Sequence, residues 1–439
     1  MGRFGTWILI FTLLLSIEGC KNKDKQPELS TTDISKVLNA MTDIMIHDVT
    51  NPPLAARFYS YALLSGYQII AHNDPKYAGM LTKINGYVKI EKPAGLEASS
   101  VSLSAVLAMI ETAKKMQPTG KDLEDFRKVF IDSCIKAGFD EEVIAVSTSY
   151  AQWVSTSMLK FAKADKYNRI SNYIRYTPVG GEGTWAPTPP GNFAAVEPYF
   201  NTIRSFTLDT CSQFKPAPPA PFSREKNSAF YKMMLETAAE EGKNMPTKHR
   251  EIASFWDCNP FALQDNGHML FGLKKISPGA HWLGITGIAC KQSKIDFSKA
   301  FKIHTMVAMG LMDGFISCWD EKYRSNRIRP ETAIRMLRNP NWKPLLQTPP
   351  FPEYPSGHST ISATSATILT HFFGENYKYF DTVEERFGLP ARTFTSFKSA
   401  AEEAAISRLY GGIHYRDGVE KGLKQGFKVG SWVIEKLDN

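Results

Sequence analysis

The feature that most constrains the fold is a long apolar segment at residues 296–322. Ile303, Val307, Leu311 and Phe315 recur at four-residue steps along it. The opposite face of the same helical pattern is apolar too, so no side of it is suited to water. Such a helix is stable only when other elements cover all of its faces. The sequence therefore predicts a buried central helix with the rest of the chain packed around it.

Helical patterns also dominate the remainder of the chain. No run alternates apolar and polar residues between hairpin turns, so no extended sheet is expected. The fold class predicted from these patterns is all-α, a helical bundle. Apolar residues at helical spacing place the other helices at residues 33–46, 54–70, 101–116, 123–136, 141–167, 223–239, 247–256, 331–338, 359–373, 395–410 and 419–437.

Prolines and glycines crowd together at residues 178–221 and interrupt the helical patterns. We interpret this segment as an extended connector that lies on the surface. On that interpretation residues 31–439 form one domain, with its polar motifs in 296–439. The alternative is that the connector separates two independent domains, since 439 residues are enough for either arrangement.

The N-terminal residues resemble an export signal. Arg3 precedes an apolar run at residues 7–17, and Gly-Cys follows, as at a lipoprotein cleavage site. We expect a signal peptide at 1–20, a lipid on Cys20 and a flexible tether at 21–30, which would anchor the protein in the periplasm or at the cell surface. An ordinary signal peptide with a chance cysteine is the alternative. No later stretch has about 18 uninterrupted apolar residues, so no transmembrane body is expected.

Charge and cysteine content exclude some functions. The formal net charge is +8 at pH 7, but the basic residues are spread along the chain, and no nucleic-acid-binding module is recognisable. Nucleic acid is therefore not an expected partner. Five cysteines follow Cys20 at loose spacing, without a zinc-binding pattern, and the sequence assigns no disulfide pairing. Cys318 lies within the central apolar segment and is predicted to be a buried thiol.

Three polar clusters occur in the C-terminal part of the chain, at residues 322–330, 348–358 and 407–417. In the first, Lys322 and Arg329 are seven residues apart, and Pro330 disfavours helical geometry at Arg329. Both side chains can therefore reach a common point where the central helix ends. Arg408, in the third cluster, ends another predicted helix. Three converging cations repel one another unless a multivalent anion lies between them.

The second cluster ends in a turn that suits an anion. Ser356 is a preferred N-cap residue for the helix at 359–373, and Gly357 lets the backbone approach a bound group closely. The free N–H groups and the dipole of a helix N-terminus favour negative charge. His358 would lie in the first turn of that helix. A Pro-Ser-Gly turn also occurs as a simple helix cap, so this cluster alone does not establish a site.

Together and in this order, the three clusters resemble the signature shared by vanadium-dependent haloperoxidases and the type 2 phosphatidic acid phosphatase superfamily. The resemblance implies an all-α fold, vanadate as cofactor and catalysis by His358 as the acid–base group. It implies that vanadium bonds to His414, whose other ring N–H is expected to be accepted by Asp417, three residues on. The cofactor would be held by Lys322, Arg329, Ser356, Gly357, His358, Arg408 and His414.

Two aromatic residues indicate which reaction the site performs. Trp319 lies one helical turn before Lys322, and Phe351 precedes the Pro-Ser-Gly-His turn. Aromatic residues at these positions resemble the halide pocket of vanadium chloroperoxidases and of bacterial iodide-oxidising relatives. The resemblance therefore implies hydrogen peroxide and a halide as substrates, iodide first and then bromide, with hypohalous acid as product. The alternative is that both side chains only pack in the core.

Similarity to bacterial haloperoxidase-like proteins extends to the segments at 51–57, 255–261 and 279–282, and so over most of residues 45–437. His268 and His281 are interpreted as structural rather than as extra ligands. Two other functions stay open. One is an acid phosphatase in which His414 is phosphorylated and His358 protonates the leaving group. The other is an envelope lipoprotein that binds an oxyanion without catalysis.

Overall fold

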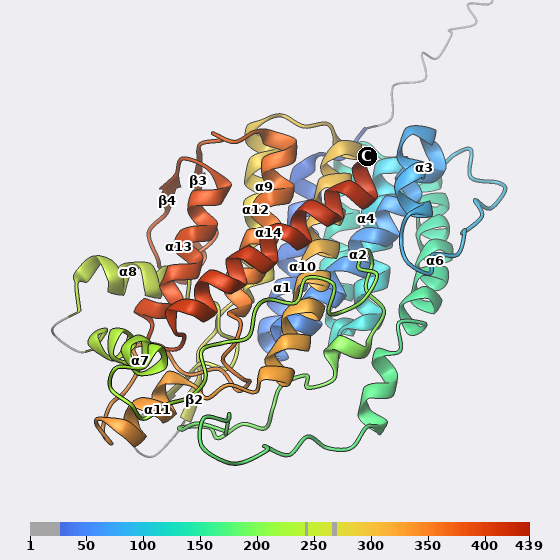
Figure 1. The fold of residues 1–439 in the computed structure, drawn as a ribbon. Coiled ribbons are helices and arrows are strands. Elements are labelled where there is room, and N and C mark those ends of the chain that lie inside the picture. The colour runs from blue at the N-terminus through green and yellow to red at the C-terminus, as the bar shows by residue number, and fades with distance from the viewer. Residues whose placement is uncertain (1–26, 242–244, 266–269) are drawn as a thin grey trace, which may run out of the picture.

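A computed structural model describes residues 27–241, 245–265 and 270–439 (Figure 1). Helices dominate the described residues, as expected for an all-α fold. Their bounds are α1 (Thr31–His47), α2 (Pro52–Asn73), α3 (Pro75–Thr82), α4 (Val101–Met116), α5 (Leu123–Lys136), α6 (Glu141–Lys163), α7 (Ala229–Ala239), α8 (Thr247–Phe255), α9 (Pro278–Gln292), α10 (Phe297–Ser325), α11 (Pro330–Leu337), α12 (Gly357–Phe373), α13 (Phe397–Tyr410) and α14 (Arg416–Asp438).

Helix α10 is the central element of the fold. It packs against α2 on one side and α12 on the other, with α9 and α14 also in contact (Figure 1). Its side chains are buried almost without interruption from Ala300 to Lys322. The Asp296 side chain caps its N-terminus, and Asn326 ends it in a left-handed conformation with φ of 47°. The predicted buried central helix is therefore confirmed.

Two groups of helices flank α10 (Figure 1). Helices α2, α4 and α6 pack side by side in the N-terminal half, and α12, α13 and α14 do so in the C-terminal half. One contiguous hydrophobic core runs through both groups, from Ile34 on α1 to Leu437 on α14. Side chains of α10 belong to this core throughout, so the two halves share one interior.

Helix α9 was not predicted from the sequence, because it is buried on nearly every face and rich in glycine. Ser277 caps its first turn and Pro278 occupies its first position, where a missing N–H costs nothing. Two short antiparallel ladders also escaped prediction. β1 (Leu263–Asp265) pairs with β2 (Leu270–Gly272), and β3 (Tyr379–Asp381) pairs with β4 (Arg392–Phe394).

The segment at 178–221 is irregular, with several turns and a short 3₁₀ helix, Phe200–Thr202. The prediction that it lies on the surface is wrong for several of its large apolar side chains, since Trp185, Phe206 and Leu208 are each 1% exposed. These side chains gain more by packing on the helices than by lying in water. Asp313 of α10 holds the segment by accepting the backbone N–H of Phe206, at 2.7 Å.

The expected signal peptide at 1–20 and most of the expected tether at 21–30 lie outside the described residues, as does His268. Of the expected tether, residues 27–30 are described, and Ser30 is the N-cap of α1. Among the described helices, none combines the length and apolar character needed to cross a membrane.

Candidate active site

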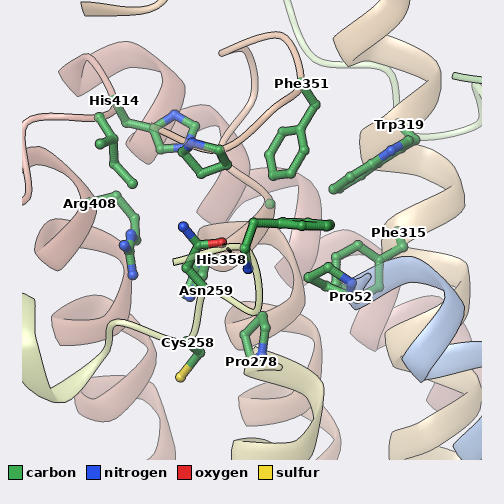
Figure 2. A pocket seen from close by; sticks show the side chains of 14 residues that line it. Pro52, Cys258, Asn259, Pro278, Phe315, Trp319, Phe351, His358, Arg408 and His414 are labelled. Atoms are coloured by element: carbon green, nitrogen blue, oxygen red, sulfur yellow. Dashed lines mark hydrogen bonds between the residues drawn. The ribbon is translucent and has the colours of Figure 1, made fainter. Parts of the chain in front are cut away.

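A small cavity of about 30 Å³ lies where the C-terminal helices meet α10 (Figure 2). In that view His414 and Arg408 lie on one side, and Phe351, Trp319 and Phe315 on the other. Its lining residues come from segments far apart in the sequence, namely Pro52, Cys258, Asn259, Phe261, Pro278, Phe315, Trp319, Pro349, Phe351, Gly357, His358, Arg408, Ile413 and His414.

The N-terminus of α12 supplies one wall of the cavity. Ser356 is the N-cap, and its hydroxyl accepts the backbone N–H of Ser359 at 3.3 Å, which leaves its own proton free to donate. A Cβ on Gly357 would lie 3.3 Å from the Trp319 ring, so glycine allows this close approach. His358 Nε2 is buried and has no partner among the described residues. Burial, reinforced by the nearby charge of Arg408, lowers the pKa of His358 well below its usual value.

Arg329 and Arg408 bring buried positive charge to the site. Arg329 Nε donates to the Phe351 carbonyl at 2.8 Å, and Nη1 donates to the Ile413 carbonyl at 2.9 Å. Arg408 Nη1 donates to the Trp256 carbonyl. Arg329 Nη2 and Arg408 Nε are buried without a partner among the described residues. Burial lowers the pKa of Arg329 to about 10, with Arg408 adding to the effect, and burial also lowers the pKa of Arg408.

His414 lies beside Arg329 with both ring nitrogens in defined contacts. Nδ1 is 2.6 Å from Glu353 Oε1, and because a carboxylate only accepts, Nδ1 carries the proton. Nε2 is then a lone-pair acceptor, and Arg329 Nη1 donates to it at 3.2 Å. Burial and then the charges of Arg329 and Lys322 lower the pKa of His414, so the ring is neutral. A neutral imidazole with an unprotonated Nε2 is the form that bonds to a metal.

The expected role of Asp417 is wrong. Its carboxylate does not contact the His414 ring but pairs with the guanidinium of Arg327, with N–O distances of 2.7 Å. Arg327 also pairs with Glu353, which is the carboxylate that His414 Nδ1 contacts. Glu353 was missed because it is 61 residues from His414, whereas Asp417 is only three away. The sole sequence signal was its position inside the 348–358 cluster.

Lys322 is buried but does not line the cavity. Its ammonium group donates to the carbonyls of Pro352, Glu353 and Pro355 at 3.0, 3.1 and 2.6 Å. Burial lowers the pKa of Lys322 to about 7. In this geometry Lys322 holds the 352–355 loop directly and contributes only its charge to the site.

Trp319 and Phe351 line the cavity together, with ring centroids 4.9 Å apart. The Trp319 indole N–H donates to the Val196 carbonyl at 3.1 Å, so the ring presents only apolar atoms to the cavity. Phe315 packs edge-on against Trp319 and extends the same wall. Pro52 was not predicted to belong to the site, although its segment resembled haloperoxidase-like proteins.

His281, interpreted from the sequence as structural, has protein partners at both ring nitrogens. Its Nε2 lies 2.9 Å from Asp381 and its Nδ1 lies 3.1 Å from Glu384. Cys258 is 3.7 Å from the same nitrogen, and these polar groups have one another as partners. Burial opposes charge on this ring, but Asp381 outweighs it and raises the pKa of His281. The His281 ring stacks on the ring of Trp256, with centroids 4.6 Å apart. The backbone carbonyl of Trp256 is the one to which Arg408 donates.

The site meets the requirements for binding a tetrahedral oxyanion. Arg329 Nη2, Arg408 Nε and His358 Nε2 are buried polar atoms without partners in the described part of the chain, next to the neutral ring of His414. Each unpaired buried donor costs about 1–3 kcal/mol, and an anion with several oxygens removes that cost. Vanadate and phosphate both have this shape and charge. The predicted convergence of side chains from three separated clusters is therefore present.

Comparisons with known proteins identify the family of the chain. The family model described as the VCPO second helical-bundle domain matches residues 302–439. A crystal structure described as the first bacterial vanadium-dependent iodoperoxidase is 39% identical, with a TM-score of 0.87, over 94% of this chain and 98% of that one. No curated protein matches the sequence.

Two structures of bacterial vanadium-dependent chloroperoxidase share the fold. The holo-type is 14% identical with a TM-score of 0.67, over 94% of this chain and 98% of that one. The apo-type is 15% identical with a TM-score of 0.63, over 88% and 94%. Because the 39% identical relative spans nearly the whole chain, this protein belongs to the family of bacterial vanadium-dependent haloperoxidases.

Proposed function

We propose that this protein is a vanadate-dependent haloperoxidase that uses hydrogen peroxide to oxidise a halide, iodide in preference to bromide, to hypohalous acid. The observation that carries the proposal is the set of buried polar atoms on Arg329, Arg408 and His358 that have no partner among the described residues and surround the neutral His414 ring. The similarity to a bacterial iodoperoxidase supports the choice of iodide.

Side chains of this site would divide the work of holding vanadate. His414 Nε2 would bond to the vanadium, and Arg329 and Arg408 would neutralise the oxygens with their unpaired N–H groups. Ser356 and the N–H of Gly357 donate to the oxygens at the α12 N-terminus. When bound, vanadate supplies a Lewis acid that polarises peroxide for attack by a halide.

His358 is positioned to move protons. His358 lines the cavity, its Nε2 has no partner among the residues that the structure describes, and its lowered pKa keeps the ring neutral, so it can accept a proton. It would take a proton from hydrogen peroxide as the substrate binds and return it to the departing oxygen. General acid–base catalysis by a positioned side chain typically contributes about 10²–10⁴-fold to a rate.

The wall formed by Phe315, Trp319 and Phe351 suits iodide. All three side chains are almost completely buried, at 1%, 1% and 8% exposure, and present apolar surface to the cavity. Binding in such a place requires the halide to lose water. Iodide is the largest and most polarisable of the common halides, so it loses water most easily and is also the easiest to oxidise.

The test is the addition of orthovanadate to metal-free protein, followed by iodide and hydrogen peroxide. We expect vanadate-dependent iodide oxidation, and we expect His414→Ala to abolish both this activity and the retention of vanadium. Glu331→Gln is a matched control, because Glu331 is buried but bonds to Thr348 and Arg335 rather than to the site. Full activity in His414→Ala would contradict the proposal.

An acid phosphatase is the second candidate, and one observation favours it. The contact between His414 Nδ1 and Glu353 leaves the lone pair on Nε2, which suits a nucleophile as well as a metal ligand. Hydrolysis of phosphate esters without vanadate, measured beside iodide oxidation with vanadate, separates the two. Ester turnover that vanadate only inhibits, without any iodide oxidation, would reverse the ranking.

We also propose that the chain is exported and carries a lipid on Cys20. The apolar run at 7–17 followed by Gly-Cys supports this. Labelled fatty acid should enter the full-length protein produced in bacteria and should be absent from Cys20→Ala. Absence of label from the unmodified chain would contradict lipid anchoring.

A further inference from the structure

Glu353 is a fully buried carboxylate that touches the site without lining the cavity. Its Oε1 accepts from His414 Nδ1 at 2.6 Å and from the backbone N–H of Tyr415 at 3.2 Å. Its Oε2 accepts from Arg327 Nε at 2.5 Å. Both oxygens are thus engaged, and the carboxylate cannot rotate without breaking a contact.

Arg327 holds Glu353 in this position. One edge of its guanidinium pairs with Glu353, and the other donates to both carboxylate oxygens of Asp417 at 2.7 Å. The guanidinium also stacks between the rings of Tyr354 and Tyr415, 4.8 and 4.9 Å from their centroids. Asp417, Arg327 and Glu353 therefore form a chain of charges that ends on the His414 ring.

The backbone leaves no space for Glu353 to move. A Cβ on Gly418 would lie 2.3 Å from Glu353 Oε1 and 3.1 Å from Arg327 Nη2. Only glycine at this position therefore allows the carboxylate to reach His414. The close fit provides a way to displace Oε1 without changing any charge.

The contact with Glu353 determines what His414 can do. It keeps the proton on Nδ1, so the Nε2 lone pair faces Arg329 and the cavity. A carboxylate hydrogen-bonded to a metal-binding imidazole also raises the basicity of the ring. The surrounding positive charges of Lys322, Arg329 and Arg408 act in the opposite direction, because they repel a positive charge on the ring and so lower the pKa of His414.

We propose that Glu353, held by Arg327 and Asp417, is the positioning residue that sets the affinity of His414 for vanadate. This inference rests on the proposed function. Loss of such an outer partner typically lowers metal affinity by about 10–100-fold. The acceptor oxygen and the negative charge of Glu353 contribute separately, so variants that remove one or both should differ.

The experiment measures the dissociation constant of orthovanadate by equilibrium dialysis. Glu353→Gln keeps an acceptor oxygen for Nδ1–H but loses the charge, and we expect about tenfold weaker binding. Gly418→Ala keeps the charge but displaces Oε1, and should weaken binding by a similar factor. Glu331→Gln, the matched control, should bind vanadate like the unmodified protein. Thermal unfolding of each variant shows whether it folds.

The tautomer of His414, read by ¹⁵N NMR of its ring nitrogens without vanadate, provides a readout that general loss of stability does not change. We expect the Nδ1–H form in the unmodified protein and in Glu331→Gln, and a mixture of tautomers in Gly418→Ala. If the unmodified protein binds no vanadate, the proposed function fails. If it binds vanadate and both Glu353→Gln and Gly418→Ala bind equally well, only the role of Glu353 is wrong.

Discussion

At the scale of single residues, we expect Phe351 to influence which halide the cavity accepts. Its ring lies between the Lys322 ammonium, 5.0 Å from the centroid, and the cavity. Phe351→His would place an N–H donor on an otherwise apolar wall. A hydrogen bond to an ion contributes about 1.5–3 kcal/mol, and the smaller, more strongly hydrated bromide gains more from it than iodide. We expect the ratio of kcat/KM for bromide to that for iodide to rise roughly tenfold.

Phe351→Leu is the control for this prediction, because it removes the ring without adding a donor. The ratio should stay within about twofold of the unmodified protein, since no hydrogen bond is gained. A ratio that rises equally in both variants would show that cavity size rather than the apolar wall selects the halide.

Some residues of the site could be predicted from the sequence and others could not. Arg408, His358 and His414 were predictable because each lies in a short motif with fixed local geometry, such as the N-terminus of α12. Glu353 was not, because its contact with His414 depends on how the chain folds over 61 residues. Lys322 was expected at the anion, but sequence spacing gave no sign that three carbonyls would use its donors.

At the scale of elements, the contact between α12 and α14 depends on three glycines four residues apart, Gly422, Gly426 and Gly430. A Cβ on Gly426 would lie 2.0 Å from the Thr360 carbonyl oxygen. This contact holds α12, whose N-terminus carries His358, against α14. Gly426→Ala should therefore lower the free energy of unfolding by about 1–3 kcal/mol, or more if the helices cannot separate.

Gly79→Ala in α3 is the matched control, because its Cβ would meet nothing within 4 Å. Alanine is favoured over glycine in an exposed helix by about 0.5–1 kcal/mol, so this variant should be as stable as the unmodified protein or more stable. Denaturant unfolding of both variants checks the pair. Equal stability of Gly426→Ala and the unmodified protein would refute the close-packing account of α12 and α14.

At the scale of the whole molecule, the central helix was predictable and the segments packed around it were less so. A helix that is apolar on all faces must be buried on all faces, and α10 is. The connector at 178–221 was misjudged because proline and glycine content indicates an extended chain but not where that chain packs. Its large apolar residues, such as Trp185 and Phe206, are the sequence feature that indicates packing against the helices, and both are buried.

Because one core runs through both halves, the described body should unfold as a unit. Gly426→Ala lies in the C-terminal half, yet it should also speed amide hydrogen exchange in α4 of the N-terminal half. Exchange measured by mass spectrometry under native conditions tests this. Unchanged exchange in α4, with faster exchange in α12 and α14, would instead support two independent domains on either side of the connector.

The most direct test of the account is the position of vanadium in crystals of the protein grown with orthovanadate, read from anomalous scattering. We predict a single peak within bonding distance of His414 Nε2, with Arg329 Nη2, Arg408 Nε and His358 Nε2 turned toward it. A saturated crystal with no peak beside His414, or with vanadium bound only elsewhere, would contradict the assignment of this site.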